Sequence, residues 1–490
     1  MACSTENTMK VAIAYPPIPS DKGVPLLSQN RQFQWFNEAT YICPVVPACA
    51  ATMASRAGHE VVWLDGIAEE WSEDEFLRRA VAARPDLMLI EAKTPIVKAY
   101  WRWIAKLKEK LPSTRLALAG DHVTALPAES FEMSPVDYVL TGGDYDFLLV
   151  NLLAHLQDKA DLEPGIWFKD GESVSNTGKF VCEHDLGKLP WIDRDLIHWK
   201  LYSTKNGNFR KTPGTYIMSG RDCWHGKCTF CSWTTLYTNF RMRDPIDAVN
   251  EIGDLIERYG VREVMDDTGT FPTGEWLRTF CREVIARGYN KRISIDCNMR
   301  FGRLGLDDYK LMKEAGFRFV LFGLESANQA TLDRLQKGLR VEDILKGAEA
   351  ASRAGLAVHV TVMFGYPWEG PAEIDRTVKL ARELMLRGFA HSLQVTLVIP
   401  YPGTPLFKDC EEQRLLTSLD WDNYDMRQAI MKSGVSETEI KAAIRKVYRS
   451  YFHLSSLWYR LVHIRRFLDD FRYYWRGLFR IAGHLRDFGR

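Results

Sequence analysis

Apolar and polar residues in the first third of the chain alternate in a pattern that predicts strands and helices in turn. Short runs rich in Val, Ile and Leu are typical of buried parallel strands, and they occur at Val11–Tyr15, Glu60–Leu64, Leu87–Ile90, Arg115–Ala119 and Val136–Leu140. Amphipathic stretches between them favour helices, at Pro47–Ala57, Ser72–Ala83, Val97–Lys110 and Tyr145–His155. This order predicts an open, doubly wound, Rossmann-like α/β domain over residues 8–156.

A second alternating region follows a connector at residues 157–208, which is rich in turn residues. Strands are expected at Thr215–Ser219, Glu263–Asp266, Ser294–Asn298, Phe317–Gly323, Ala357–Phe364 and Ser392–Ile399. Helices are expected at Asp244–Tyr259, Glu275–Arg287, Gly305–Ala315, Ala330–Leu335, Val341–Ala354 and Pro371–Arg387. Six β–α units predict a partial or complete parallel (β/α) TIM barrel in a domain at 209–410, with its active site at the carboxyl ends of the strands.

Composition favours a globular protein of the cytoplasm. The 490 residues, 46% of them apolar, suffice for two or three domains, and 64 basic against 63 acidic residues give no bias towards nucleic acid. The chain starts without a basic and apolar leader, and it has no run of uncharged apolar residues long enough to span a membrane. Scattered cysteines such as Cys281 and Cys297 indicate ordinary buried thiols in a reducing compartment rather than a disulfide framework.

Three cysteines stand close together after the first expected barrel strand. Cys223, Cys228 and Cys231 lie within nine residues, and three thiolates on so short a loop can face one point, as an iron–sulfur cluster requires. Three protein ligands leave one metal position open to a small molecule, which favours chemistry over a structural role. The alternative is a structural zinc loop whose fourth ligand is distant or is His225.

Polar residues also stand at the carboxyl ends of the other expected barrel strands, where they are candidates for binding a ligand. Asp266 and Asp267 follow the second strand, and their alternative role is to cap the helix after it. Arg300 follows the third strand, and its alternative is a pair with an acidic neighbour. Glu325 follows the fourth strand and has the alternative of a buried ion pair.

The strand ends of the N-terminal domain carry a second set of candidates, because doubly wound sheets bind ligands beyond those ends. The set is Thr94, Gly120, Asp121, His122, Thr124, Gly142 and Gly143. Its glycines remove side chains where a bulky group could approach the backbone. The alternative is that these glycines are simply turns of an α/β domain.

Several motifs resemble those of known families. The cysteine loop, Phe-Gly-Leu-Glu-Ser ending at Ser326 and Gly-Tyr-Pro ending at Pro367 resemble the radical S-adenosylmethionine (SAM) superfamily, from about Thr215 to Phe407. Ala119-Gly-Asp-His-Val-Thr-Ala-Leu-Pro, followed by Val-Asp-Tyr-Val-Leu-Thr-Gly-Gly143, resembles the cobalamin-binding domain that precedes the barrel in many such enzymes, over residues 8–155. The chain is therefore similar to the cobalamin-dependent radical SAM enzymes.

This resemblance implies roles for the candidate residues. Cys223, Cys228 and Cys231 would hold a 4Fe-4S cluster whose fourth iron binds the amino and carboxylate groups of SAM. The other residues implied in SAM binding are Phe230 against adenine, Asp266 and Asp267 at the amino group, Arg300 and Glu325 at the ribose or carboxylate, and Val398 at a backbone edge for adenine. The N-terminal candidates would hold cobalamin.

The chain departs from the family patterns in three places. Radical SAM enzymes usually have three and then two residues between their cysteines, whereas this chain has four and then two, and Gly226 is expected to absorb the extra residue. It lacks the Asp-x-His-x-x-Gly motif that supplies a histidine to cobalt. His122 is accordingly expected to lie near a phosphate or amide. Cobalamin is expected to bind without a protein histidine below the metal. The last strand leads to Gly142-Gly-Asp-Tyr-Asp146 instead of Gly-Glu-Gly-Glu.

The implied function is methylation of an unactivated carbon of a small-molecule or lipid-like substrate, through a 5′-deoxyadenosyl radical and methylcobalamin. An external electron donor of the flavodoxin or ferredoxin type would reduce the cluster. The alternative keeps both cofactors but transfers no methyl group, as in a cyclase, oxidase or rearrangement enzyme like the anaerobic cyclase of bacteriochlorophyll synthesis. A third hypothesis is a non-catalytic cobalamin or redox sensor.

A C-terminal helical region is expected over residues 411–490. From Lys441 to Arg490 it carries twelve Lys or Arg against three Asp, with aromatic residues interleaved. Such a helix can lie at a membrane surface beside anionic lipids, which would give the protein a peripheral membrane location. Its alternatives are to close the barrel mouth, to bind an acidic partner or to cover apolar surface.

Overall fold

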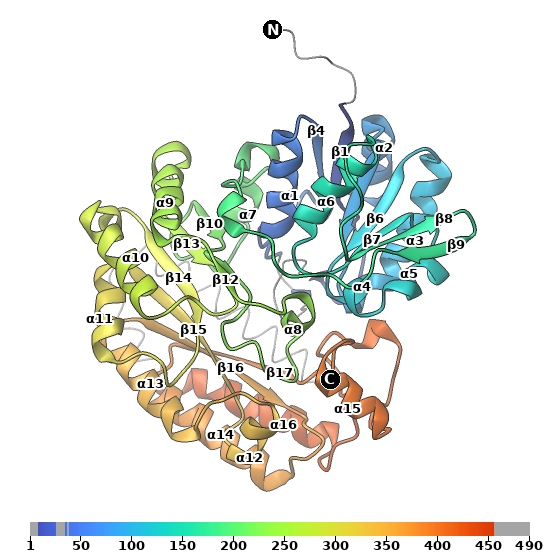
Figure 1. The fold of residues 1–490 in the computed structure, drawn as a ribbon. Helices are drawn as coiled ribbons and strands as arrows, with labels where there is room; N and C mark the ends of the chain where they lie inside the picture. The colour runs from blue at the N-terminus through green and yellow to red at the C-terminus, as the bar shows by residue number, and fades with distance from the viewer. Residues whose placement is uncertain (1–7, 26–34, 37–38, 455–490) are drawn as a thin grey trace. The chain divides into compact units, whose positions relative to one another are not determined.

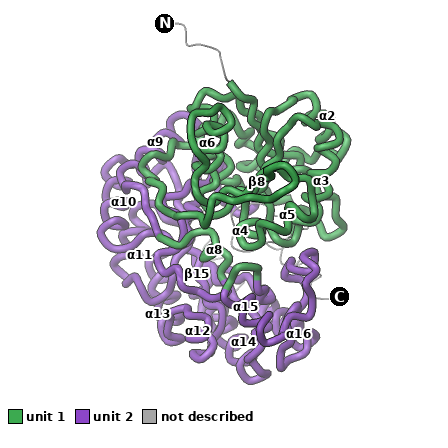
Figure 2. Tube along the Cα trace, turned by 45° about the vertical axis from the view of Figure 1, so that its right-hand side comes forward, with its two compact units in different colours: residues 1–205, 231–239, 401–404 green, residues 206–230, 240–400, 405–490 purple. Residues whose placement is uncertain are grey.

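The computed structural model describes residues 8–25, 35–36 and 39–454, which form two compact units (Figure 2). Unit 1 consists of the described residues up to Lys205 together with two later segments, Cys231–Asn239 and Tyr401–Thr404. Unit 2 consists of the described residues of the remaining segments, Asn206–Phe230, Phe240–Pro400 and Pro405 onwards. Each unit is described below by itself.

The sheet of unit 1 has five parallel strands in the order β4–β1–β5–β6–β7, as the doubly wound pattern predicts. They are β1 (Lys10–Tyr15), β4 (Glu60–Asp65), β5 (Leu87–Glu91), β6 (Arg115–Ala119) and β7 (Tyr138–Leu140). The helices are α1 (Val45–Arg56), α2 (Glu73–Ala83), α3 (Val97–Lys110), α4 (Asp121–Ala125), α5 (Pro127–Met133) and α6 (Tyr145–His155). Figure 1 shows α1 beside α6 and the sheet between them and α2, α3 and α5.

The sheet continues into residues that were expected to be a connector. Strands β8 (Ile166–Asp170) and β9 (Ser173–Asn176) form a hairpin that adds to β7 in antiparallel direction. Unit 1 also contains two short helices, α7 (Lys200–Thr204) and α8 (Trp233–Leu236). The two-residue strands β2 (Val24–Pro25) and β3 (Trp35–Phe36) pair with each other in antiparallel direction.

Unit 2 is built on six parallel strands in the order β10–β13–β14–β15–β16–β17. They are β10 (Gly214–Ile217), β13 (Glu263–Asp266), β14 (Ser294–Met299), β15 (Phe317–Glu325), β16 (Ala357–Phe364) and β17 (Ser392–Leu397). The helices are α9 (Pro245–Tyr259), α10 (Glu275–Ala286), α11 (Leu306–Glu314), α12 (Gln329–Arg334), α13 (Val341–Arg353) and α14 (Pro371–Leu386). Of these, α9, α10, α11, α13 and α14 follow one another along the outside (Figure 1). Within the described residues β10 and β17 do not pair, so the barrel is partial.

Local sequence signals set the ends of these helices. The Asp244 carboxylate accepts hydrogen bonds from the backbone N–H groups of Ile246 and Asp247, and Pro245 occupies the first turn of α9. Gly260 ends α9 in the left-handed conformation, with φ +63°. In unit 1, Ser72 caps α2 in the same way by accepting from the N–H of Glu75.

The C-terminal region begins with helices, as expected. They are α15 (Pro405–Glu412) and α16 (Glu437–Tyr448), and the hydroxyls of Tyr448 and Tyr451 hydrogen-bond the edge of β17 at Val395 and Leu393. These phenols therefore cover backbone groups that an edge strand would otherwise expose. The remainder of the basic, aromatic tail, 455–490, lies outside the described residues. Among the described helices, none combines the length and the apolar character needed to cross a bilayer.

Candidate functional site

The cysteine loop leaves the carboxyl end of β10 through a short antiparallel pair, β11 (Gly220–Arg221) with β12 (Arg241–Met242). Gly226 has φ +57°, so it adopts the left-handed conformation that the extra residue of the loop was expected to require. Asp222 also has a positive φ, +71°. Gly269 packs against this turn so closely that a Cβ there would lie 2.8 Å from the Cys223 nitrogen. The loop is thus held by backbone packing.

Two of the thiols have defined surroundings within unit 2. The Cys223 Sγ lies 2.9 Å from the Thr270 hydroxyl, and the Cys228 Sγ lies 3.9 Å from the Arg300 guanidinium. Burial raises the pKa of the Cys228 thiol, while the positive charges of Lys337 and Arg300 act against this rise. These two cations favour the thiolate form of Cys228.

The His225 ring contacts a backbone carbonyl group. Its Nε2 lies 2.6 Å from the Gln336 carbonyl oxygen, and burial lowers its pKa to about 4 although this hydrogen bond acts in the opposite direction. Across the part of the chain that the structure describes, no three His, Cys, Asp or Glu side chains converge where one metal ion would sit. The backbone contact therefore occupies one of the two ring nitrogens of His225.

Asp266 holds two strand ends together. Its carboxylate, fully buried at the end of β13, accepts hydrogen bonds from the N–H groups of Ser219 (3.1 Å) and Thr268 (2.9 Å). Burial raises its pKa, and these hydrogen bonds lower it again. Asp266 therefore caps the loops after β10 and β13 rather than the following helix. Asp267 is also largely buried, and its N–H donates to the Ile217 carbonyl.

Glu325 forms the buried ion pair that was its alternative role. It follows a register shift in β15 with φ +63°, and the Lys337 ammonium lies 2.7 Å from its Oε1. Gly323 leaves room for this pair, because a Cβ there would lie 2.1 Å from that oxygen. The same ammonium stands 5.7 Å from the ring centroid of Phe230. Lys337 follows α12 in a loop, where strand-end reasoning does not find it.

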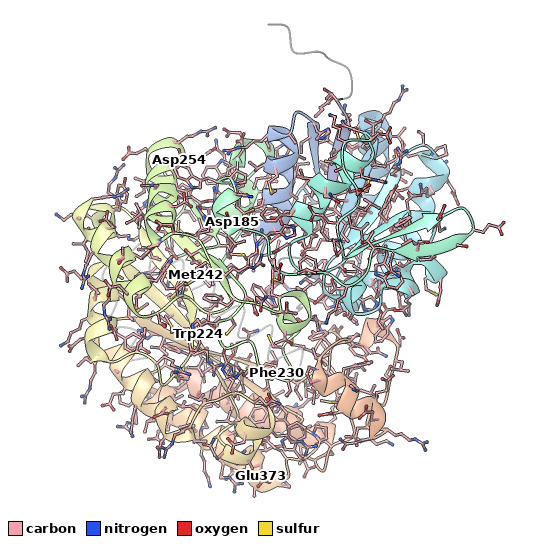
Figure 3. The ribbon with its side chains drawn as sticks, in the orientation of Figure 1. Asp185, Trp224, Phe230, Met242, Asp254 and Glu373 are labelled. Carbon is pink, nitrogen blue, oxygen red and sulfur yellow. The ribbon has the colours of Figure 1, made fainter. Side chains whose placement is uncertain are left out.

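Phe230 and Val398 belong to one apolar cluster at the carboxyl end of the barrel. Phe230 packs against Val398, Tyr366 and neighbours, and the N–H of Val398 donates to the Phe364 carbonyl at 2.9 Å. Figure 3 labels Phe230 together with Trp224, whose ring faces the Arg300 guanidinium at 5.5 Å. The cluster is an apolar wall beside charged groups.

Buried polar atoms without a hydrogen-bond partner gather around the same strand ends. Among the described residues they include Arg300 Nε, Tyr366 OH and Glu369 Oε2. The other Glu369 oxygen accepts from the hydroxyls of Ser326 and Thr331. An unsatisfied buried donor or acceptor costs about 1–3 kcal/mol, so a polar ligand that completed these bonds would recover free energy.

The carboxyl ends of the unit 1 strands differ, because their polar groups pair with one another. The Glu91 carboxylate accepts from Tyr15 (2.7 Å) and Tyr145 (2.9 Å), and burial raises its pKa. The buried Lys93 ammonium lies 3.7 Å from Asp121. This cluster stands between β1 and β5, where the strand order reverses and such sheets bind ligands.

His122 and the two threonines also face inward. The fully buried His122 ring lies 3.3 Å from the Thr94 hydroxyl and 3.0 Å from the Glu129 carboxylate. Thr124 donates to the Gly120 carbonyl and accepts from the Gly142 N–H, so it joins two strand ends. Among the described residues, His122 therefore meets a hydroxyl and a carboxylate.

The three candidate glycines allow close packing of the protein's own atoms. A Cβ at Gly120 would lie 2.2 Å from the Ala92 carbonyl oxygen, one at Gly142 2.2 Å from the Phe180 ring, and one at Gly143 2.0 Å from the Tyr237 ring. Gly120 and Gly142 have φ +119° and +82°. Their small size is therefore required for internal packing, whatever else they contact.

Comparisons with known proteins identify a domain of known family and several relatives. Residues 217–381 match the model of the radical SAM superfamily. An uncharacterized methyltransferase of Pyrococcus horikoshii is 25% identical over 431 residues, 84% of this chain and 87% of the relative. The anaerobic magnesium-protoporphyrin IX monomethyl ester cyclase of Cereibacter sphaeroides is 23% identical over 433 residues, 86% of this chain and 67% of the relative.

The fold also matches a solved structure. The radical SAM methyltransferase TsrM of Kitasatospora setae, solved with cobalamin and a 4Fe-4S cluster bound, superimposes with a TM-score of 0.65, 16% identity, and coverage of 83% of this chain and 78% of TsrM. Residues 217–381 therefore form a radical SAM domain, and the fold of the chain resembles that of TsrM.

Proposed function

We propose that this protein is a cobalamin-dependent radical SAM methyltransferase acting on an unactivated carbon of a small-molecule substrate. The observation that carries the proposal is the pairing, in one chain, of a radical SAM domain bearing three clustered cysteines with an N-terminal sheet of the order β4–β1–β5–β6–β7. The methyltransferase relative and the fold of TsrM support the assignment of methyl transfer.

The barrel end fits a 4Fe-4S cluster and SAM. Cys223, Cys228 and Cys231 would hold the cluster, with the Thr270 hydroxyl and the Arg300 guanidinium beside two of the sulfurs. The buried Arg300 and Tyr366 atoms that lack partners are suited to the carboxylate and hydroxyl groups of SAM. The apolar cluster containing Phe230 and Val398 is suited to its adenine.

The carboxyl ends of the unit 1 strands fit cobalamin through their fold and their donor groups. His122 is not proposed as a ligand of the cobalt. The Tyr100 hydroxyl, at the start of α3, is fully buried and lacks a partner among the described residues. The Asp65 and Glu91 charges add to the burial that raises the Tyr100 pKa. We assign the corrin amides to this edge, with Thr94, Asp121 and the loops at Gly120, Gly142 and Gly143.

When bound, SAM and the reduced cluster supply a carbon-centred radical, and cobalamin supplies the methyl group. The residues of this chain align and shield those groups. Asp266 fixes the spacing of β10 and β13, Lys337 neutralises Glu325, and Arg300 places positive charge beside Cys228. The wall formed by Phe230 and its neighbours excludes water from the site of radical formation.

A second candidate function is cyclisation without methyl transfer, favoured by the cyclase relative. The two are separated by supplying SAM that carries an isotopically labelled methyl group, with reductant, cobalamin and extracts containing candidate substrates. Label in a product of increased mass supports methyl transfer. Label confined to SAM and methionine, with 5′-deoxyadenosine formed and a product whose mass does not include a methyl group, contradicts it.

The partners expected for this function are a small-molecule or lipid-like substrate and an electron donor of the flavodoxin or ferredoxin type. We also propose that residues 441–490 make a peripheral membrane contact if the substrate is lipid-like. Sedimentation with vesicles containing an anionic lipid tests this, against vesicles of neutral lipid, because basic helices bind only the former strongly. Equal binding to both would contradict it.

A further inference from the structure

A short segment of unit 1 runs from the third cysteine to the glycine edge of the N-terminal sheet. Directly after Cys231, the Thr234 N–H and hydroxyl both bond the Cys231 carbonyl, at 3.1 and 2.7 Å. Helix α8 follows, and the Tyr237 N–H closes it by donating to the Trp233 carbonyl at 2.9 Å. The segment therefore has hydrogen bonds at each step from the cysteine to Tyr237.

The far end of this segment is fixed on Gly143. The Gly143 N–H donates to the Leu236 carbonyl at 2.9 Å, and the Tyr237 hydroxyl donates to the Gly143 carbonyl at 3.1 Å. The Tyr237 ring is 1% exposed and lies where a Cβ of Gly143 would be. Three independent contacts thus join one backbone position to the end of α8.

A second contact holds the same helix. Gly403 lies against Thr235 and Ala125, so that a Cβ there would be 2.9 and 2.8 Å from their side chains. Ala125 is the last residue of α4, which begins directly after the Gly120 strand end. Because it is packed on both sides, α8 cannot shift at Gly143 without moving its neighbours.

We propose that Tyr237 is a positioning residue that couples a ligand at the Gly142–Gly143 edge to the third cluster thiolate, Cys231. This rests on the proposed function. A cofactor that approaches Gly143 must meet or displace the Tyr237 ring, and any movement of that ring is transmitted through α8 to the backbone of Cys231. Because coupling between two bound groups is reciprocal, cluster assembly must change the affinity of this edge for its ligand.

The test measures cobalamin affinity and the cluster spectrum in the full-length protein. Hydroxocobalamin is titrated by absorbance into cluster-free and anaerobically reconstituted protein, and the electron paramagnetic resonance spectrum of the reduced cluster is recorded with and without it. Tyr237→Phe removes the hydroxyl bond, and Gly143→Ala forces the ring away. Tyr138→Phe, the same chemical change at the start of β7, is the matched control.

We expect the cluster to change the dissociation constant of cobalamin by about fivefold or more, the usual lower range of such coupling, and cobalamin to alter the cluster spectrum. Tyr237→Phe should bring this ratio towards one while cobalt and iron still bind, Gly143→Ala should also bring it towards one, and Tyr138→Phe should leave it unchanged. A ratio of one in the unmodified protein, or an unchanged ratio in Tyr237→Phe, overturns the coupling alone. Failure to bind cobalamin overturns the proposed function as well.

Discussion

The carboxyl ends of the two sheets have opposite hydrogen-bonding states. At the barrel, Arg300 and Tyr366 keep buried polar atoms without partners among the described residues. At the N-terminal sheet, Glu91 is saturated by Tyr15 and Tyr145. Free polar atoms in a buried place are costly unless a ligand completes them. The barrel end is therefore organised for a polar ligand, whereas most of the N-terminal edge is closed on itself.

The glycines at the two edges do not follow this contrast, because all of them make room for side chains of the protein itself. Gly142 and Gly143 seat aromatic rings of the protein, and Gly323 seats an ion pair beside Phe230. A small residue at a strand end thus shows only that something lies close to the backbone. Whether that neighbour is a ligand or the chain itself depends on tertiary packing.

The largest expected effect comes from breaking the charged pair at the barrel. Lys337→Met leaves the buried Glu325 carboxylate without its partner, which should cost about 3–5 kcal/mol of stability. Urea unfolding of the cluster-free protein measures this loss. The double variant Glu325→Gln with Lys337→Met should recover most of it. A change below about 0.5 kcal/mol in the single variant would show that the pair is not buried as described.

The next effect tests the space that this pair requires. Gly323→Ala places a Cβ 2.1 Å from the Glu325 oxygen, and relief of the clash should cost about 1–3 kcal/mol. Gly305→Ala is the matched control, because nothing lies within 4 Å of its Cβ position. Thermal unfolding of both variants separates the clash from the general effect of replacing glycine. Equal melting temperatures would refute the close approach.

Replacement of a tyrosine by phenylalanine at each edge compares the two hydrogen-bonding states directly. Tyr145→Phe removes a donor from buried Glu91 and should cost about 1–3 kcal/mol, whereas Tyr366→Phe removes a hydroxyl that has no partner and should cost little in the cluster-free protein. Tyr366→Phe should instead weaken SAM binding, measured by equilibrium dialysis of the reconstituted protein. The reverse order of stabilities would contradict the contrast between the edges.

The smallest expected effect is on the stability of residues 177–187, the segment that contains Phe180. His184 bridges Asp144 and Glu163 at 3.0 and 2.9 Å; burial lowers its pKa, but these two carboxylates outweigh burial and raise the pKa above 6.5. Because the pKa of His184 is higher in the folded protein, the stability that its two ion pairs provide is fully present below pH 6.5. This stability is lost as the pH rises through the folded-state pKa.

Hydrogen exchange of residues 177–187, corrected for intrinsic rates, should therefore be faster at about pH 9 than at about pH 6 in the unmodified protein. His184→Gln should reduce this difference, because glutamine does not titrate. An equal pH dependence in both proteins would show that His184 does not fasten this segment.

Much of the fold follows from the sequence because its strands are buried on both faces and its helices are amphipathic. The predicted Arg115–Ala119 and Ala357–Phe364 match β6 and β16. The hairpin at 166–176 was missed, although Asp170-Gly171 is a usual turn signal, because its strands are half exposed and carry no continuous apolar run.

The site was harder to predict than the fold, since spacing finds residues but not their partners. Spacing located Asp266 and Glu325 at strand ends. The structure shows that Asp266 hydrogen-bonds two loops, whereas Glu325 forms an ion pair with Lys337. Lys337 itself lies after a helix, in a loop with no motif. His122 follows a strand end, but its ring turns into the interior, a direction that the sequence does not specify.

The most direct test of the account is the metal content of the three cysteines. Anaerobically reconstituted protein should contain about four iron and four sulfide per chain, and its reduced form should cleave SAM to 5′-deoxyadenosine and methionine. Replacement of Cys223, Cys228 and Cys231 by alanine should abolish both, while Cys410→Ala should retain them. Zinc in place of iron and sulfide, or a full cluster in the triple variant, would contradict the account.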